Sequence, residues 1–358
     1  MLRENQDIIK NNIFTWIEEK LKPEICTSED FIYNEMESQS DYSLPVIYQD
    51  FDANDKWHWN DRGMLYDFLY STNGEGKKLL DFGPGDGWPS LIVVPFAKEV
   101  VGVDSSVKRV TICTENAKRL GIHNASFINY KAGCKLPFED NSFDAILAAS
   151  SIEQTPDPKA TLYELHRILK PGGRIRIYYE ALSDYKDGYE NDIWIVGLPE
   201  NRCKLIIFNR NIENEYALQY GLTIAMGEKD LKTRLINSGK SNFDEKNPND
   251  LSDENIRFEQ VTVSFLESIK ELIIKAQVCK TIHPSGKTWV SWLKEVGFKK
   301  VLPTYSGGLA AYKLFELYTD EDRPSNMKAV DEAIRKVVKI VTELEAPIDI
   351  DPMITAVK

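Results

Sequence analysis

Between residues 78 and 179, short apolar segments alternate with segments whose apolar residues recur at helical spacing. One such segment, Val107–Leu120, follows a capping Ser106 and ends at Gly121, so it is expected to be a helix. Helices are also expected at 90–98 and 158–169, and strands at 78–82, 99–104, 125–130, 143–149 and 174–179. Strands separated by helices of this length predict a parallel sheet with right-handed crossovers.

The alternation stops after residue 181 and resumes near residue 285, with a helix expected at 288–296 and strands at 299–304 and 310–317. The stretch between is rich in Asn, Asp, Glu and Lys, and within it residues 261–278 show helical periodicity. We therefore expect one α/β domain (65–181 plus 285–320), an insertion (182–284), an N-terminal helical extension or lid (1–64) and a C-terminal helical extension (321–358).

Composition narrows the range of partners. The 358-residue chain carries a formal charge of −12, which disfavours a nucleic-acid partner because phosphate binding needs clustered Lys and Arg. It has no segment typical of a signal peptide, and its apolar runs are too short to span a membrane. The five cysteines are scattered without metal-ligand spacing, which favours reduced thiols in the cytoplasm and predicts no metal site.

The segment most informative about chemistry is the end of the first expected strand. Asp81 is followed by glycines at alternate positions, Gly83, Gly85 and Gly87. Glycine permits backbone conformations and close approaches that a side chain would block, so a ligand can lie directly on this turn. The dinucleotide fingerprint would need a third glycine where the chain has Trp88. The spacing therefore favours a nucleoside ligand and argues against a dinucleotide.

Asp104 ends the second expected strand. A carboxylate at this position can accept two hydrogen bonds from the hydroxyls of a ribose. It could instead cap the helix that follows, although Ser105 and Ser106 would serve that purpose equally well.

Four segments occur in order at consistent spacing: 81–87, 100–105, 136–144 and 164–173. With these motifs, residues 78–180 resemble the class I S-adenosylmethionine-dependent methyltransferases, in the small-molecule branch that includes ubiquinone and menaquinone methyltransferases. A weaker echo covers 288–317. The resemblance implies a Rossmann-like α/β fold with a mostly parallel seven-stranded sheet, and it implies S-adenosylmethionine as cofactor, with S-adenosylhomocysteine as product.

The resemblance also implies roles for individual residues. The turn would contact the methionine and ribose parts of the cofactor, with Asp81 holding the amino group and Asp104 the ribose hydroxyls. The residues implied to contact the cofactor are Asp81, Gly83, Pro84, Gly85, Gly87, Asp104, Ser105, Lys131, Ala132, Gly133, Ser150 and Ser151. Two positions depart from the family pattern: many relatives have Asp where this chain has Ala132, and many have His where this chain has Ile152-Glu153-Gln154.

The predicted activity is transfer of a methyl group to an unidentified small molecule, with 182–284 acting as a lid that shapes the acceptor pocket. A base is needed only if the acceptor must lose a proton, and the candidates are Glu153, Glu180 and Tyr179, although Tyr179 could equally well be a packing residue. Two alternatives stay open: a sensor or scaffold that binds the cofactor without catalysis, and an NAD(P)-dependent oxidoreductase. The sequence also leaves open whether the chain forms a homodimer.

Overall fold

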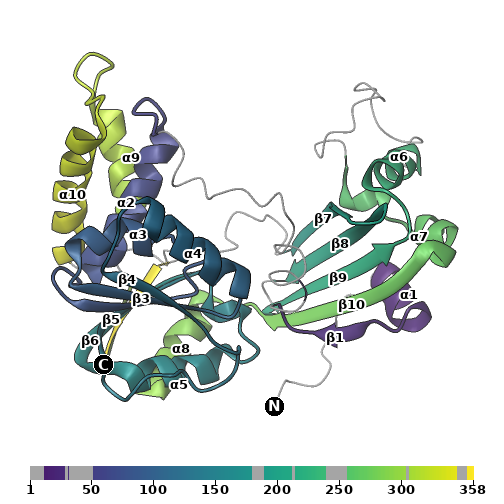
Figure 1. The fold of residues 1–358 in the computed structure, drawn as a ribbon, viewed down its shortest axis with the longest axis horizontal. Helices are drawn as coiled ribbons and strands as arrows, with labels where there is room; N and C mark the ends of the chain where they lie inside the picture. Colours follow the sequence, from purple (N-terminus) through teal and green to yellow (C-terminus); the bar gives the residue numbers. More distant parts are fainter. Residues whose placement is uncertain are drawn as a thin grey trace. The chain divides into compact units, whose positions relative to one another are not determined.

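The computed structural model describes residues 12–28, 31, 51–179, 189–211, 214–238, 256–303, 306–344 and 353–358 (Figure 1). The chain divides into two compact units. We call residues 37–181 with 284–358 the α/β unit, and residues 1–36 with 182–283 the inserted unit. Within the described ranges, every helix is too short or too polar to span a bilayer. The domain boundaries expected from the sequence stay a prediction.

Seven strands form the sheet of the α/β unit, in the order β11-β12-β6-β5-β2-β3-β4. Their bounds are β2 Lys78–Phe82, β3 Glu99–Asp104, β4 Ala125–Asn129, β5 Phe143–Ala149, β6 Leu169–Tyr178, β11 Lys300–Pro303 and β12 Met353–Val357. Strands β4, β3, β2, β5 and β6 pair in parallel. The mostly parallel seven-stranded sheet is therefore confirmed, and the chain order reverses between β2 and β5, where sheets of this kind bind ligands.

The strand expected at 310–317 is wrong, because these residues belong to helix α9 (Gly307–Leu317). Ser306 caps this helix by accepting a hydrogen bond from the N–H of Leu309 at 3.2 Å. Gly307 and Gly308 lie in the first turn of α9, where they allow close packing on helix α2 (Lys56–Ser71). A Cβ at Gly63 of α2 would lie 2.3 Å from the carbonyl oxygen of Gly307.

The seventh strand is instead β12, within the segment expected to be a helical extension. It lies between β6 and β11 and runs antiparallel to both. The same segment also contains a helix, α10 (Met327–Glu343), as a helical extension requires.

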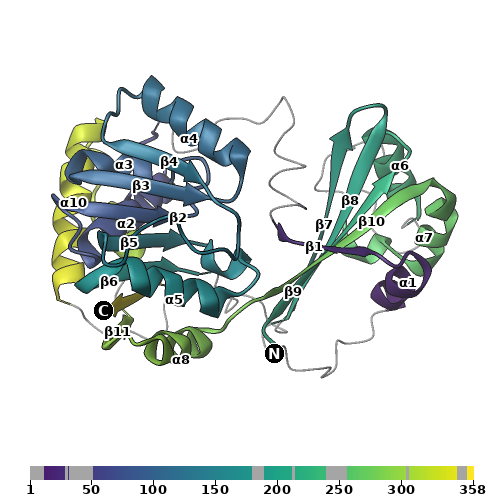
Figure 2. The same ribbon diagram turned by 60° about the horizontal axis from the view of Figure 1, so that its bottom comes forward.

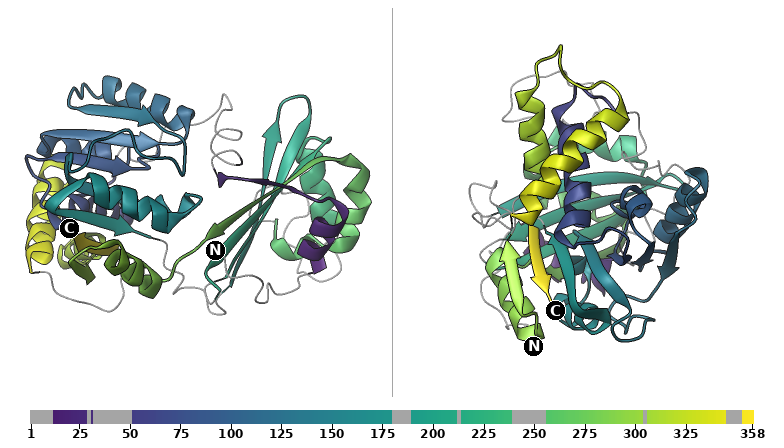
Figure 3. Two further views of the ribbon diagram at one scale, coloured as in Figure 1. Left: turned by 90° about the horizontal axis from the view of Figure 1, so that it is seen from below. Right: turned by 90° about the vertical axis from the view of Figure 1, so that its left-hand side faces the viewer.

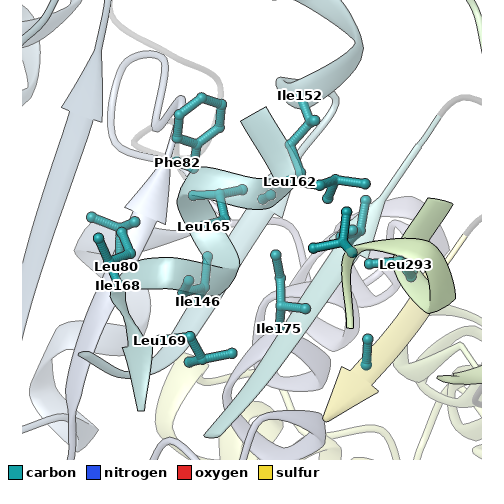
Figure 4. Close-up of a cluster of buried hydrophobic side chains, with 14 of the residues drawn as sticks. Leu80, Phe82, Ile146, Ile152, Leu162, Leu165, Ile168, Leu169, Ile175 and Leu293 are labelled. Carbon is teal, nitrogen blue, oxygen red and sulfur yellow. The ribbon is translucent and has the colours of Figure 1, made fainter. Parts of the chain in front are cut away.

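Helices cover both faces of the sheet. One face packs against α5 (Pro158–Ile168) and α8 (Gly286–Val296), through a cluster that includes Leu162 and Leu293 (Figure 4). The other face packs against α2, α9 and α10, which lie side by side (Figures 1 and 2). Successive residues of β2 point to opposite faces, so Leu80 belongs to the first cluster and Leu79 to the second.

A fully buried ion pair joins the α2 face to the sheet. Asp67 of α2 accepts two hydrogen bonds from Arg176 of β6, at 2.8 and 3.0 Å. It also accepts from the hydroxyl of Ser71 at 2.8 Å and from the N–H of Gly307 at 2.7 Å. Arg176 donates in turn to Thr355 of β12 at 3.0 Å, so one network links α2, α9, β6 and β12.

The inserted unit is a five-stranded sheet in the order β1-β10-β9-β8-β7, with helices on one face (Figure 3). The bounds are β1 Glu24–Cys26, β7 Tyr189–Leu198, β8 Arg202–Asn211, β9 Tyr216–Ile224 and β10 Ile273–Ile282, with helices α1 Asn12–Lys20, α6 Glu228–Ser238 and α7 Val263–Ile269. The helix expected over 261–278 is therefore partly wrong: its first half contains α7, but its end belongs to β10.

Candidate functional site

The turn after β2 contains three glycines in the left-handed region. Gly83, Gly85 and Gly87 have φ angles of +72°, +59° and +119°. The N–H of Gly83 donates to the carbonyl of Val103 on β3 at 2.8 Å, which fixes the start of the turn. A Cβ at Gly83 would lie 2.4 Å from the Cβ of Ser151, so both the backbone conformation and the lack of space require glycine there.

Asp81, near the end of β2, is fully buried. Its Oδ2 accepts hydrogen bonds from the N–H of Ser90, at 3.1 Å, and from the hydroxyl of Ser90. Its Oδ1 has no hydrogen-bond partner among the residues that the structure describes. Burial raises the pKa of Asp81 to about 7, against the hydrogen bonds from Ser90 and with the help of the Asp104 charge.

Asp104 lies at the end of β3 and is nearly buried. Its Oδ1 accepts from the N–H of Ser106 at 2.8 Å, and its Oδ2 accepts from the N–H of Gly85 at 3.3 Å. The cap of helix α4 (Val107–Arg119) is Ser106, whose hydroxyl accepts from the N–H of Arg109. Asp104 therefore does not serve as the helix cap, and its carboxylate contacts the glycine turn.

Two side chains of helix α4 donate hydrogen bonds to carbonyls of the glycine turn. The sequence analysis did not predict these contacts. The thiol of Cys113 donates to the carbonyl of Gly85 at 3.2 Å, and the amide of Asn116 donates to the carbonyl of Asp86 at 3.1 Å. These two side chains lie three residues apart on one helical face, and both are buried. The sequence feature that could have indicated these contacts is the placement of Asn116 on an otherwise apolar face of the helix, because a buried amide needs a hydrogen-bond partner.

The segment after β4 forms a turn. Gly133 has a φ of +76°, and the N–H of Cys134 donates to the carbonyl of Lys131 at 3.1 Å. Lys131 and Gly133 are exposed and Ala132 is half-buried. Ser105, after β3, accepts a hydrogen bond at its carbonyl from Asn129, the last residue of β4.

The residues after β5 meet the glycine turn. The hydroxyl of Ser151 donates to the carbonyl of Phe82 at 2.6 Å. The N–H of Ser150 donates to the carbonyl of Tyr178 at 2.9 Å, and Ser150 has a φ of +44°. The ends of β2, β5 and β6 are thus tied together by these two serines.

Two of the three candidate catalytic residues lie within the described structure. Glu153, on a short 3₁₀ helix after β5, and Tyr179, after β6, are each 3% exposed. The ring of Tyr179 lies 6.2 Å from that of Trp289 on α8. Glu180 lies outside the described residues.

Trp88 follows the third glycine of the turn. Its ring packs edge to face against Phe68 of α2, with centroids 5.6 Å apart. It therefore anchors the turn to the helical face of the α/β unit.

These features fit S-adenosylmethionine as a ligand. The glycine turn beside Asp81 holds three glycines at positive φ, and the unpartnered Oδ1 of Asp81 suits a group that brings a proton or a positive charge. The carboxylate of Asp104 lies at the end of the neighbouring strand, where a ribose diol is bound in nucleoside-binding sheets. Among the described residues, no group of three or more His, Cys, Asp or Glu side chains is arranged to hold a metal ion.

Comparison with known proteins identifies the class. A family model described as a methyltransferase domain matches residues 80–177, which begin within β2 and end within β6. Together with the strand order and the glycine turn, this match shows that the chain carries a class I S-adenosylmethionine-dependent methyltransferase domain. S-adenosylmethionine is the cofactor of this class.

The chain is similar to several curated methyltransferases over this region. It is 36% identical to the sterol 24-C-methyltransferase erg6 of Aspergillus fumigatus over 120 residues, which cover 33% of this chain and 31% of the relative. It is 35% identical to the demethylmenaquinone methyltransferase of Geobacillus stearothermophilus over 102 residues, which cover 28% of this chain and 43% of the relative. The matched region thus spans less than half of either relative's length.

One solved structure matches a longer part of the chain. The crystal structure of a S-adenosylmethionine-dependent methyltransferase from Clostridium acetobutylicum is 13% identical, covers 73% of this chain and 87% of that chain, and has a TM-score of 0.42.

Proposed function

We propose that the whole chain is an enzyme that transfers a methyl group from S-adenosylmethionine to a small-molecule acceptor. The observation that carries the proposal is the pair of carboxylates Asp81 and Asp104, which lie near the ends of adjacent strands, beside the glycine turn. The curated relatives support the acceptor class, because by name they act on a sterol and on demethylmenaquinone.

In this proposal the chain's own residues bind and orient the cofactor. The open Oδ1 of Asp81 would accept from the amino group of the methionine part, and the carboxylate of Asp104 would accept from the ribose hydroxyls. Gly83, Pro84, Gly85 and Gly87 would offer backbone, Ser150 and Ser151 would flank the methionine part, and Ser105 with Lys131, Ala132 and Gly133 would flank the adenine. When bound, S-adenosylmethionine supplies a methyl carbon that is already a good electrophile. Alignment and exclusion of water are then the main tasks of the site.

Proton removal is a separate requirement that depends on the acceptor. Glu153 and Tyr179 are candidates because both are buried beyond the ends of β5 and β6. Glu180 is a third candidate by its position in the sequence. A base would raise the rate only for an acceptor that carries its proton at the working pH.

Titration calorimetry and a turnover assay test the proposal together. We expect S-adenosylmethionine and S-adenosylhomocysteine to bind and NAD(H) not to bind, because Trp88 occupies the third glycine position of the dinucleotide fingerprint. Release of S-adenosylhomocysteine in the presence of a small-molecule extract supports an enzyme. Cofactor binding without any release would favour the sensor or scaffold, and binding of NAD(H) alone would favour the oxidoreductase.

Location and assembly belong to the same proposal. We infer a cytoplasmic protein, supported by five cysteines that are odd in number and scattered along the sequence. The net charge of −12 supports a partner other than nucleic acid. A homodimer stays a hypothesis, which light scattering on the purified chain would test.

A further inference from the structure

Two cysteines that are far apart in the sequence lie directly opposite each other in the inserted unit. β1 pairs in parallel with β10, and in that register Cys26 is the partner of Cys279. Because paired residues on neighbouring strands point to the same face, the two thiols lie on one face of the sheet. That face is opposite the helices, since the adjacent residue Val278 packs into the helix-covered cluster.

Contacts hold both thiols near the strand junction. The thiol of Cys26 donates to the carbonyl of Val278, the residue before Cys279, at 3.5 Å. The sulfur of Cys279 lies 3.3 Å from the hydroxyl of Ser28. Cys26 also packs against the small apolar cluster that contains Cys279 and Phe31. Each sulfur is therefore held within the neighbourhood of the other strand.

The spacing suits a covalent bond. Neighbouring strands lie about 4.8 Å apart, and disulfides join residues whose Cα atoms are roughly 4.4–6.8 Å apart. Cys26 is partly exposed on the edge strand, whereas Cys279 is 3% exposed. An external reagent therefore reaches Cys26 first.

We propose that Cys26 and Cys279 are a modification site that forms a reversible disulfide with low-molecular-weight disulfides such as oxidised glutathione. The thiolate of Cys26 attacks the glutathione disulfide and releases one glutathione thiol. The thiolate of Cys279 then attacks the mixed disulfide at Cys26 and releases the second. The two cysteines lose two electrons and two protons, and one glutathione disulfide becomes two thiols.

The bond would fix a weakly held strand. β1 has three residues and lies at the edge of the sheet, so few ladder hydrogen bonds hold it to β10. The disulfide would prevent β1 from leaving β10, and a reductant would restore its freedom. This inference does not depend on the proposed methyl transfer.

Peptide mapping of the folded chain tests the pairing. After incubation with oxidised glutathione and blocking of the remaining thiols, non-reducing digestion should give a linked pair of peptides, one carrying Cys26 and the other Ala276–Lys280. Five cysteines form ten distinct pairs, so oxidation of the denatured chain should give this pair about one tenth of all links. We expect about tenfold enrichment in the folded chain; an unchanged share would overturn the proposal.

Single variants test the order of attack. Cys279→Ser should trap one glutathione on Cys26, whereas Cys26→Ser should leave Cys279 unmodified, and equal modification of both would overturn the assigned roles. Cys134→Ser is the matched control, because Cys134 is the exposed cysteine of the α/β unit, and its loss should leave the Cys26–Cys279 link unchanged. If Cys279→Ser fails to fold, the map of the unmutated chain still decides the pairing.

Hydrogen exchange gives a readout of the strand itself. The amides of Glu24–Cys26 should exchange more slowly in the oxidised chain than in the reduced chain, and those of the opposite edge strand β7 should not change. Equal exchange in both forms would remove the structural consequence that we assign to the bond.

Discussion

Two aspartates in the α/β unit are both fully buried, yet their surroundings differ. Asp67 accepts four hydrogen bonds, two of them from a buried arginine, so both of its oxygens are satisfied. Asp81 accepts only from Ser90, and its Oδ1 has no partner among the described residues. Burial raises the pKa of Asp81 to about 7, as expected for a carboxyl that lacks a compensating cation.

We interpret this difference as that between a structural charge and one that, on the proposed function, a bound ligand would complete. A buried carboxylate with a complete set of donors holds elements together, as Asp67 joins α2, α9 and β6. A buried carboxylate with an open oxygen destabilises the empty protein, and a ligand that supplies the missing donor recovers the lost energy. If the proposed function holds, the number of hydrogen-bond donors around a buried carboxylate distinguishes a ligand-binding aspartate from a structural one in this chain.

Breaking the satisfied pair should have the largest effect. Asp67→Ala leaves the guanidinium of Arg176 buried without its partner, and we expect the free energy of unfolding to fall by about 3–5 kcal/mol. Urea denaturation followed by circular dichroism measures the loss. The matched control is Asp331→Ala, which breaks the more exposed pair between Arg62 of α2 and Asp331 of α10. That pair should be worth about 1 kcal/mol or less, and equal losses in the two variants would contradict the distinction.

The glycine turn beside Asp81 offers a second test. Gly83→Ala places a Cβ 2.4 Å from that of Ser151, and Gly83 has a φ of +72°. We expect a stability loss of about 2–4 kcal/mol together with loss of cofactor binding, because strain and overlap add.

The variant Gly76→Ala distinguishes the cost of the backbone conformation from the cost of overlap with a neighbouring side chain. Gly76 has a φ of +68°, but a Cβ there would have no neighbour within 4 Å. Gly76→Ala should therefore cost only about 1–2 kcal/mol, for the backbone conformation alone, and leave cofactor affinity unchanged. Thermal unfolding and calorimetry measure both quantities. A Gly76→Ala loss as large as that of Gly83→Ala would show that space in the turn is unimportant.

The open carboxylate predicts a stability that depends on pH. The folded-state pKa of about 7 lies above the ordinary value of 3.8, so the folded chain binds more protons than the unfolded chain between these values. The free energy of unfolding therefore falls as pH rises from about 4 to about 7, and the cost is complete above that range. Asp81→Asn removes this cost, because its amide oxygen can still accept from Ser90 while the amide nitrogen takes the place of Oδ1.

We expect apo Asp81→Asn to be about 2–4 kcal/mol more stable than the unmutated chain at pH 8, since a pKa shift of about 3 units corresponds to at most about 4 kcal/mol, and we expect the difference to shrink toward pH 4. Its affinity for S-adenosylmethionine should fall at least about tenfold, since an amide cannot offer a carboxylate to an ammonium group. Denaturation at a series of pH values measures the difference in stability, and calorimetry measures the change in affinity. A variant that is less stable at every pH would contradict the open-oxygen interpretation.

The sequence drew attention to Asp81 and Asp104, which stay predicted site residues, but not to the buried Asp67–Arg176 network. Asp81, the glycines and Asp104 lie within short motifs whose spacing reflects local backbone geometry. Asp67 and Arg176 carry no such signal, because a helix and a strand bring them together and nothing near either residue indicates the partner. The same limit hid β12, whose place between β6 and β11 depends on distant pairing.

The inserted unit shows why its sheet was missed. All but the first residue of β8 are buried, so the strand lacks the polar–apolar alternation of a half-exposed strand. Its buried residues also include Lys204, Asn209 and Arg210, which are residue types usually found at the surface. Lys204 is accommodated by a hydrogen bond to Gln277 at 3.0 Å and by the ring of Phe31, and neither contact is visible from local sequence.

The comparison of carboxylates extends to position 132, where this chain has Ala132 and so lacks a carboxylate. Many relatives of the family that the motifs resemble have Asp at this position, facing the exocyclic amine of adenine, and Ala132 here is half-buried in the turn after β4. Ala132→Asp would supply a charged acceptor that can stay hydrated when the site is empty, unlike Asp81. We therefore expect affinity for S-adenosylmethionine to rise by about two- to tenfold, or roughly 0.5–1.5 kcal/mol, with little change in unfolding free energy. Ala132→Asn is the matched control, since it adds an acceptor of similar size without the charge. Unchanged or weaker binding of Ala132→Asp in calorimetry would mean that adenine does not lie against this turn.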